Sequence, residues 1–516
     1  MDSYEDIPYE SSPVTETDPG RLAVIARLFG VESADPGECR VLELGCAAGG
    51  NLIPLAFRNP RSSYLGIELS QRQVDDGQRL LGRLGLSNVE LRQGDIMDLG
   101  PEVGEFDYIL CHGVYSWVPD PVRGKILDLC ASQLRPGGVA YISYNTLPGW
   151  RQKGMLRDML LYHLRDTAEP AERLARAQGF LDLILQTAAE AGADHERVLK
   201  PQIERIHEAH PSYFYHEYLE AVNDPFLFSD FMAAAESHGL AYLADTDLHT
   251  MFPSALGDGA EAALSGIDEA VEQEQYLDFI RNRSFRQTLL CRAEDVTDRV
   301  LDLERFEQMG FFADVAPPRK VELRKRKAQV FRRPDGGEVR VEHPLTKAAL
   351  AQLGSRYPDA LGWEEMVSAA QAAVAGAGAQ THAAEMEHLF GELFSLFLHG
   401  KVAAVTRPGT VPRGGDHPTM DALARAHVAE GLDHLATLRH TTVMLDPLAA
   451  KLVRLLDGSR DLDGATEGMI EAVEADSSLA GGAFPPGAKP EKVKAQVRSR
   501  CAALMGLFSR QGLYEA

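Results

Sequence analysis

Cysteine is scarce in this 516-residue chain, and the few cysteines show no pattern. Six of them stand singly at positions 39, 46, 111, 130, 291 and 501, without a C-x-x-C pair or a spacing typical of a metal site. So few, unpatterned thiols in a long chain are typical of a reducing compartment. We therefore expect a cytoplasmic protein with reduced cysteines and no bound metal.

Long apolar runs and a targeting segment are missing as well. No stretch approaches the roughly 20 apolar residues that a membrane helix needs. The N-terminus, Met1-Asp-Ser-Tyr-Glu-Asp6, is acidic, whereas a signal peptide is basic and then apolar. These absences predict no membrane insertion.

Positive charge is also in deficit. The chain has 52 lysines and arginines against 76 aspartates and glutamates, for a net charge of −24. This balance argues against a general binder of nucleic acid or anionic membranes. A basic segment of a protein substrate would be attracted, although the charge is equally explained by solubility alone.

The most informative stretch that is present runs from residue 39 to 54. A short apolar run ends at Gly45, glycines recur at 49 and 50, and apolar residues then resume with helical spacing. This pattern predicts a buried strand, a glycine loop and a helix, the first βα turn of a doubly wound α/β fold. Cys46 interrupts the G-x-G-x-x-G spacing of a dinucleotide site.

The form that remains, Glu43-x-Gly45-x-x-x-Gly49, resembles motif I of class I S-adenosylmethionine (SAM) methyltransferases. Taken alone, it leaves nucleotide binding and a ligand-free structural turn open. A second strand, 63–69, carries Glu68 near its end, about where such folds bind ribose hydroxyls. After a third strand, Asp95-Ile96 resembles the adenine-binding motif, in which the carboxylate accepts from the amino group and the apolar side chain packs on the ring.

Two further strands complete the pattern. The fourth, 106–111, runs into His112, and the sequence Leu-Arg-Pro-Gly-Gly leads into the fifth, 139–144. Together the five units favour SAM. The candidate cofactor residues are Glu43, Gly45, Cys46, Gly49, Asn51, Glu68, Leu69, Asp95, Ile96 and His112.

Methyl transfer from a sulfonium is an in-line displacement that needs close positioning of donor and acceptor and no metal. Acceptor-side residues are expected after strands four and five, where ligands bind in such sheets. The candidate catalytic residues are His112, Tyr115, Trp117, Tyr144 and Asn145. Aromatic walls suit an ammonium, and Tyr115 or His112 is a candidate proton acceptor. Alternatively, most of these aromatic residues only pack the insert against the sheet.

The remaining pattern divides the chain into units. We predict an N-terminal arm (1–20), a SAM-binding domain (21–294) containing a helical insert (151–222), a connector (295–342), a winged-helix-like middle domain (343–406) and a helical C-terminal domain (419–516). On the arm, Tyr4 and Tyr9 either fold over the cofactor mouth or lie on the surface. The insert serves as a cap or dimer surface, or only as extra core.

The assembled pattern resembles bacterial class I methyltransferases that bear a methyltransferase regulatory domain, among them the rickettsial-type lysine methyltransferases of outer-membrane proteins. The resemblance is carried by residues 4–9, 42–54, 144–150, 215–220, 223–225 and 285–290. It implies a Rossmann-like sheet with a helical insert, winged-helix-like C-terminal domains, a SAM cofactor, dimerisation through the insert and contact of the later domains with a protein substrate. It does not identify the acceptor.

The favoured function is that of a SAM-dependent N-methyltransferase acting on protein lysine. The absence of an N-P-P-Y tetrad weakens a nucleobase-directed reaction. A methyltransferase for a small molecule or natural product, and a non-catalytic SAM-binding regulator, remain as alternatives.

Overall fold

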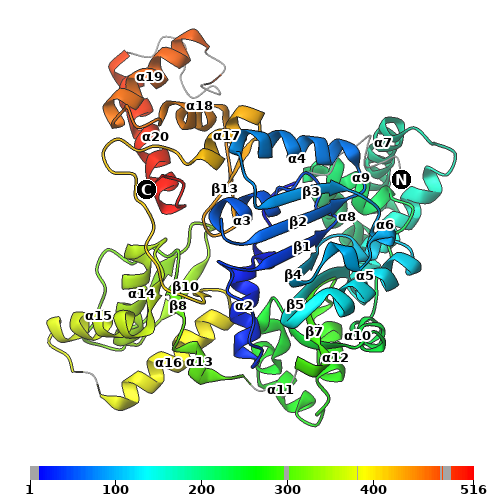
Figure 1. Cartoon of the computed structure of the whole chain (residues 1–516), viewed down its shortest axis with the longest axis horizontal. Coiled ribbons are helices and arrows are strands. Elements are labelled where there is room, and N and C mark those ends of the chain that lie inside the picture. The colour runs from blue at the N-terminus through cyan, green and yellow to red at the C-terminus, as the bar shows by residue number, and fades with distance from the viewer. Residues whose placement is uncertain (1–10, 296–300, 381, 477–478, 480–489, 516) are drawn as a thin grey trace.

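The computed structural model describes residues 11–295, 301–380, 382–476, 479 and 490–515. Figure 1 shows a central sheet with a helical insert on one side and two further units on the other. The expectations for Tyr4 and Tyr9, and the resemblance over 4–9, concern residues outside the described set.

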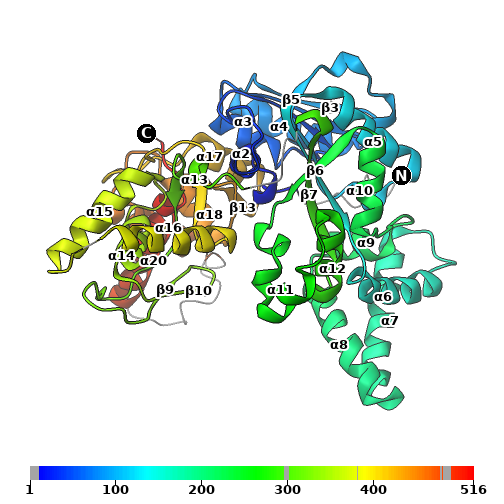
Figure 2. The same cartoon turned by 90° about the horizontal axis from the view of Figure 1, so that it is seen from below.

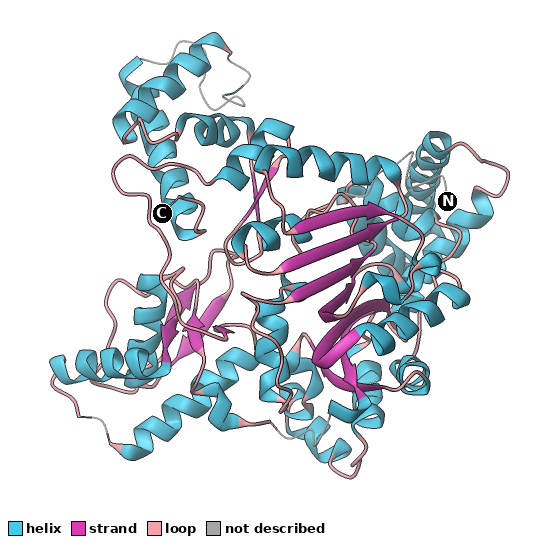
Figure 3. Ribbon diagram, viewed as in Figure 1, coloured by secondary structure: helices cyan, strands magenta, loops and turns pink. Residues whose placement is uncertain are grey.

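A seven-stranded sheet in the order β3-β2-β1-β4-β5-β7-β6 forms the core of the first domain. All pairs are parallel except those of β7, which runs antiparallel to β5 and β6 (Figure 3). This confirms the Rossmann-like α/β class. The strands are β1 (Arg40–Leu44), β2 (Ser63–Glu68), β3 (Val89–Gln93), β4 (Phe106–Cys111), β5 (Leu134–Asn145), β6 (Leu240–Asp245) and β7 (Phe285–Arg292).

Helices pack on both faces of this sheet, as a mainly parallel sheet requires. Val41, Leu42 and Leu44 of β1 are accordingly all buried. Helix α4 (Gln71–Leu84) is capped at both ends: Ser70 Oγ accepts from the Gln73 amide at its start, and Gly85, at φ +63°, follows its last residue. The helices are α2 (Pro19–Leu28), α3 (Leu52–Arg58), α4 (Gln71–Leu84), α5 (Asp120–Gln133), α10 (Phe228–Ser237), α11 (Asp258–Leu264) and α12 (Ala270–Arg281).

The insert between β5 and α10 is helical and has a core of its own. It comprises α6 (Trp150–His163), α7 (Pro170–Ala191), α8 (Ala193–Glu208) and α9 (Pro211–Leu219). Leu160, Leu181, Ile203 and Phe214 are among its buried residues. Figure 2 shows α7 and α8 projecting away from the sheet, so the insert exposes a large surface of its own.

The middle unit begins earlier than the sequence indicates. Its three-stranded sheet, in the order β11-β8-β12, takes its central strand from the segment 295–342 that we expected to be a connector. Phe306 and Phe311 of that segment lie in the same core as Leu389. The elements are α13 (Leu303–Phe306), β8 (Gly310–Phe312), β9 (Gln329–Arg332), β10 (Glu338–Val341), α14 (Pro344–Arg356), β11 (Leu361–Gly362), α15 (Trp363–Gly376), α16 (Ala383–Leu398) and β12 (Ala403–Val405).

The C-terminal unit docks on the first domain through α17, which lies beside α4 in Figure 1. Arg58 Nη2 donates to the Ala436 carbonyl at 2.8 Å and lies 3.8 Å from Asp421. The elements are α17 (Ala422–Glu430), β13 (His434–Ala436), β14 (Thr442–Met444), α18 (Pro447–Leu455), α19 (Leu462–Ala475) and α20 (Pro490–Arg510). Among all the helices in the described part of the chain, none combines the length and apolarity needed to cross a membrane.

Candidate active site

The glycine loop after β1 is fastened to the neighbouring strand by its backbone. The Gly45 and Cys46 amides both donate to the Ile67 carbonyl, at 2.8 and 3.1 Å. Gly45 and Gly49 each have φ +74°, in the left-handed region that favours glycine. A Cβ on Gly45 would lie 2.5 Å from Val114 Cγ2, so this position has no room for a side chain.

Cys46 faces the interior of the sheet. A Cβ on Gly66 of β2 would lie 2.5 Å from Cys46 Sγ, and burial raises the pKa of the thiol well above its usual value. Its carbonyl accepts from the Gly49 amide at 2.9 Å. The cysteine side chain therefore packs the loop onto β2.

Glu43 and Asn51 form a buried pair beneath the loop. Asn51 Nδ2 donates to Glu43 Oε1 at 2.7 Å, whereas Glu43 Oε2 is buried and has no partner among the described residues. Burial, and then the negative charge of Glu68, raises the pKa of Glu43 to about 8. An orphaned buried carboxylate oxygen fits a positively charged donor, such as the ammonium of SAM.

Glu68 holds the same loop from the end of β2. Its two carboxylate oxygens accept from the Ala47 amide at 2.9 Å and from the Ser70 amide at 3.0 Å. Each oxygen has a further lone pair, so the carboxylate can also accept from ribose hydroxyls.

Three apolar side chains lie beyond the C-terminal ends of β2 and β3: Leu69, Ile96 and Met97. Asp95 Oδ1 accepts from the Met97 amide at 2.9 Å and shapes the turn in which Ile96 is half-buried. Leu69 and Met97 are 44% and 43% exposed. Both residues come after the paired ends of β2 and β3, Glu68 and Gln93. Met97 was not among the residues predicted from sequence.

His112, at the end of β4, is held by β5. Its Nδ1 lies 2.8 Å from Tyr141 Oη, and the next amide, of Gly113, donates to Ser143 Oγ at 2.8 Å. Burial lowers the pKa of His112 to about 4, so the imidazole is neutral at pH 7. Tyr141 and Ser143 were missed in the sequence, although their alternation on one face of β5 was a usable signal.

Tyr115 and Tyr144 pack together on the other side of β5. They belong to an aromatic cluster with Phe226 and Phe231, in which Tyr144 stacks on Phe231 at 4.1 Å between ring centroids. Tyr144 Oη lies 3.0 Å from Thr288 Oγ1. Burial raises the pKa of Tyr115 to about 12 and that of Tyr144 further. Both side chains therefore pack inside the domain, which is the alternative that the sequence left open for these aromatic residues.

Asn145 and Trp117 join the strand ends to the insert. Asn145 Nδ2 donates to Asn223 Oδ1 at 2.8 Å, and Asn223 Nδ2 donates to the Glu217 carbonyl at 3.0 Å. Trp117 Nε1 donates to the His216 carbonyl at 3.3 Å. Helix α9 is thus fixed against the ends of both β4 and β5.

Residues from the N-terminal arm and from the C-terminal unit both form hydrogen bonds with the glycine loop after β1. Asn51 Oδ1 accepts from the Val14 amide at 3.0 Å and lies 2.7 Å from His440 Nε2 of the C-terminal unit. The Gly50 amide donates to Ser11 Oγ at 2.7 Å. A single buried amide therefore connects the arm, the glycine loop and a residue 389 positions away.

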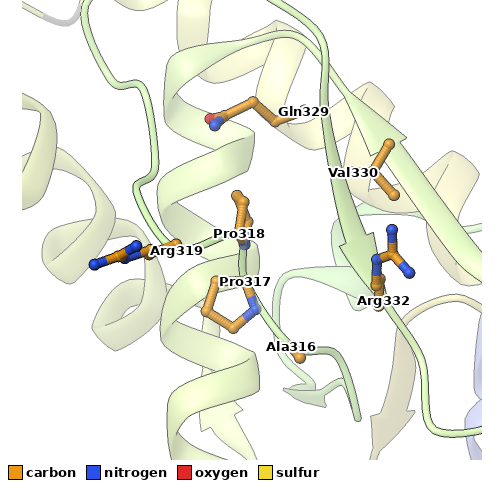
Figure 4. Close-up of a pocket in the computed structure, with 7 residues that line it drawn as sticks. All are labelled: Ala316, Pro317, Pro318, Arg319, Gln329, Val330 and Arg332. Carbon is orange, nitrogen blue, oxygen red and sulfur yellow. The ribbon is translucent and has the colours of Figure 1, made fainter.

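Other surface features lie elsewhere. One hollow is on the middle unit and is lined by Ala316, Pro317, Pro318, Arg319, Gln329, Val330 and Arg332 (Figure 4). A second is on the C-terminal unit, between α18 and α19. Within the described ranges, no group of three or more His, Cys, Asp or Glu residues is arranged to hold a metal ion.

Cofactor binding at pH 7 is expected to release a proton from Glu43. With a pKa of about 8 the carboxyl is mostly protonated at pH 7 when no cation is beside it. A ligand ammonium stabilises the carboxylate and lowers this pKa, so affinity weakens as the pH falls. Calorimetry of SAM binding in two buffers of different ionisation enthalpy measures the release. Glu43→Gln should abolish it, and an unchanged release in that variant would contradict the assignment.

Three family models match the chain. Residues 41–138 match a methyltransferase domain, residues 210–292 a predicted methyltransferase regulatory domain, and residues 416–513 the C-terminal winged-helix domain named for PKMT. The winged-helix match falls on the C-terminal unit and agrees with the expected winged-helix-like C-terminal domains. The unit at 343–406, for which the same fold was predicted, lies outside the three matched ranges.

The chain is also similar to individual proteins over nearly its whole length. An uncharacterized protein of Rickettsia prowazekii is 31% identical over 480 residues, which cover 91% of this chain and 86% of that protein. The structure of PKMT2 from Rickettsia typhi is 26% identical, with a TM-score of 0.87 over 98% of this chain and 100% of that one. The same protein in complex with AdoHcy gives a TM-score of 0.86.

Proposed function

Because the chain belongs to the family of class I SAM-dependent methyltransferases that carry a methyltransferase regulatory domain, we propose that it methylates lysine side chains of a protein. It is a methyltransferase, and its methyl donor is SAM. The proposal concerns the acceptor.

The full-length likeness to PKMT2 carries this proposal. It includes the C-terminal unit, which matches the winged-helix domain of protein lysine methyltransferases, and not only the sheet that all class I enzymes share. The net charge of −24 agrees with a basic acceptor segment. The trans-aconitate 2-methyltransferase of Deinococcus radiodurans, in contrast, is similar over only 19% of this chain.

The residues take the following roles in the proposal. SAM, when bound, supplies a methyl group on a sulfonium that is open to in-line attack. Glu43 would accept from its ammonium, Glu68 from the ribose hydroxyls and Asp95 from the adenine amino group. Ile96 and Leu69 would cover the ring, and Gly45 and Gly49 would leave the backbone close to the ligand.

On the acceptor side we assign contact with the amine to His112, Trp117 and Asn145. In the tautomer whose Nδ1–H donates to Tyr141 Oη, the neutral ring of His112 presents Nε2 as an acceptor for an amine N–H. Tyr115 and Tyr144 act through packing, by fixing the wall behind these residues.

The insert is the surface that we propose for dimerisation. Tyr162, Leu183 and Val198, three of the most exposed large apolar side chains of the described residues, all lie on α6, α7 and α8. Apolar groups left in water on a projecting element favour a partner surface.

Labelling with tritiated SAM in a lysate of the source organism tests the acceptor. We expect the label in protein, with methylated lysine identified by mass spectrometry, and no label when the Gly45→Ala variant replaces the enzyme. Label confined to small molecules would support a small-molecule methyltransferase instead. Tight SAM binding without any transferred label would support a non-catalytic regulator.

A further inference from the structure

Lys153, in the first turn of α6, holds its ammonium inside a group of three side chains. Its Nζ lies 2.8 Å from Glu217 Oε1, 3.4 Å from Tyr213 Oη and 4.7 Å from the centroid of the Trp150 ring. Tyr213 Oη also donates to Glu217 Oε1, at 3.0 Å. We call Trp150, Tyr213 and Glu217 the ammonium cage.

The cage differs from the ordinary ion pairs of the surface. Trp150 and Glu217 are only 3% and 8% exposed, so the charge and the ring that meet Lys153 are largely withdrawn from water. The pair between Lys494 and Glu467, in contrast, spans 3.8 Å between two exposed side chains. An aromatic face and a buried carboxylate together recognise an ammonium and still hold it through the ring when methyl groups replace its protons.

The position of the cage points to the acceptor side of the site. Helix α9 carries Tyr213 and Glu217 and is tied to the ends of β5 and β4 through Asn223 and Trp117. Trp150 opens α6 five residues after β5 ends at Asn145. The strand arrowheads in Figures 1 and 3 point toward these helices. Ligands of open α/β sheets bind at this edge.

We propose that the ammonium cage receives the ammonium of an acceptor lysine in a docking step, before the amine reaches His112, Trp117 and Asn145, and that Lys153 occupies the cage until an acceptor displaces it. This inference rests on the lysine acceptor proposed above. A site that already holds one lysine side chain has the chemistry to hold another. The internal lysine is always close by and competes as a tethered ligand, which lowers the apparent affinity for free lysine.

Removing the internal competitor tests the idea without the methyl donor. The probe is Nα-acetyl-lysine N-methylamide, titrated without SAM and followed by calorimetry and tryptophan fluorescence. Lys153→Met keeps the length of the side chain and removes its charge. We expect it to bind the probe about tenfold more tightly than wild type, because the partly buried ion pair and the cation–π contact no longer compete. The uncharged norleucine analogue should bind neither protein.

Three further variants control the result. Lys153→Arg retains a cation in the cage and should bind like wild type, and Lys494→Met, at an exposed pair, should change nothing. Lys153→Met combined with Glu217→Gln should lose the gain. Equal affinity of Lys153→Met and wild type overturns the proposal. So does a failure of both Lys153→Met and Lys153→Gln to fold, since Lys153 is then a structural tether between α6 and α9.

The outcome is separable from that of the proposed function. Tighter probe binding by Lys153→Met without any methyl-lysine in the labelled lysate would support the cage as an ammonium site and overturn only the acceptor. Methyl-lysine in the lysate with equal probe affinities would overturn the cage and leave the acceptor in place.

Discussion

Alanine at position 45 is expected to weaken SAM binding roughly a hundredfold while leaving the chain folded. The residue has φ +74°, and its new Cβ would lie 2.5 Å from Val114 Cγ2. The loop cannot move aside, because the amides of residues 45 and 46 both bond to the Ile67 carbonyl. Left-handed strain of about 1 kcal/mol and a forced contact of about 1–3 kcal/mol correspond to roughly a hundredfold in affinity. Isothermal calorimetry measures it.

Gly85→Ala is the matched control for backbone strain. Gly85 has φ +63° at the end of α4, and a Cβ there meets nothing within 4 Å. We expect this variant to lose about 1 kcal/mol of stability and to keep its affinity for SAM. Wild-type affinity in Gly45→Ala would remove the glycine loop from the cofactor site.

Arg286→Met is expected to lower the free energy of unfolding by about 3–5 kcal/mol, because it leaves buried carboxylates without their cation. Arg286, on β7, is 1% exposed. Its guanidinium bonds to Asp278 at 2.7 and 3.0 Å and to Glu274 at 3.2 Å, both on α12, and lies 3.8 Å from Asp245. Urea denaturation followed by circular dichroism measures the loss.

Arg292→Met, six residues further along β7, is the control for removing an arginine from the same strand. Its partner Glu294 is exposed, and pairs of this kind contribute about 0–1 kcal/mol. A loss below about 1 kcal/mol in Arg286→Met would show that the buried carboxylates find other partners or become protonated.

The strands of the first domain were predictable because several signals coincide in each of them. A short apolar run, a turn residue and a motif mark the ends of β1, β2 and β3, and the structure places those ends within a residue or two of the prediction. Strand β8 has only three residues, too few for an alternating pattern to show. It was absorbed into a supposed connector, and only its pairing with β11 and β12 reveals it.

Some residues of the candidate site could be predicted from the sequence and others could not. Residues at or just after the end of a strand, such as Glu68, Asp95 and His112, could be located by counting, since parallel strands have their C-terminal ends at one edge of the sheet. Val114 and Tyr141 could not be located in this way, because their part in the site depends on which side chains meet across the sheet. Whether Tyr115 and Tyr144 face a ligand or a neighbouring helix is decided by packing, which no local pattern records.

If Glu43 and Asn51 hold the cofactor as proposed, the contact between Asn51 and His440 couples cofactor binding to docking of the C-terminal unit. Asn51 lies between Glu43 and His440, so an arrangement of the glycine loop that suits the ligand is also the one that suits the docked unit. Coupling of this kind is reciprocal: whatever factor SAM adds to the docking constant, docking adds to the affinity for SAM. Loss of the contact between His440 and Asn51 is therefore expected to alter how tightly the first domain holds SAM.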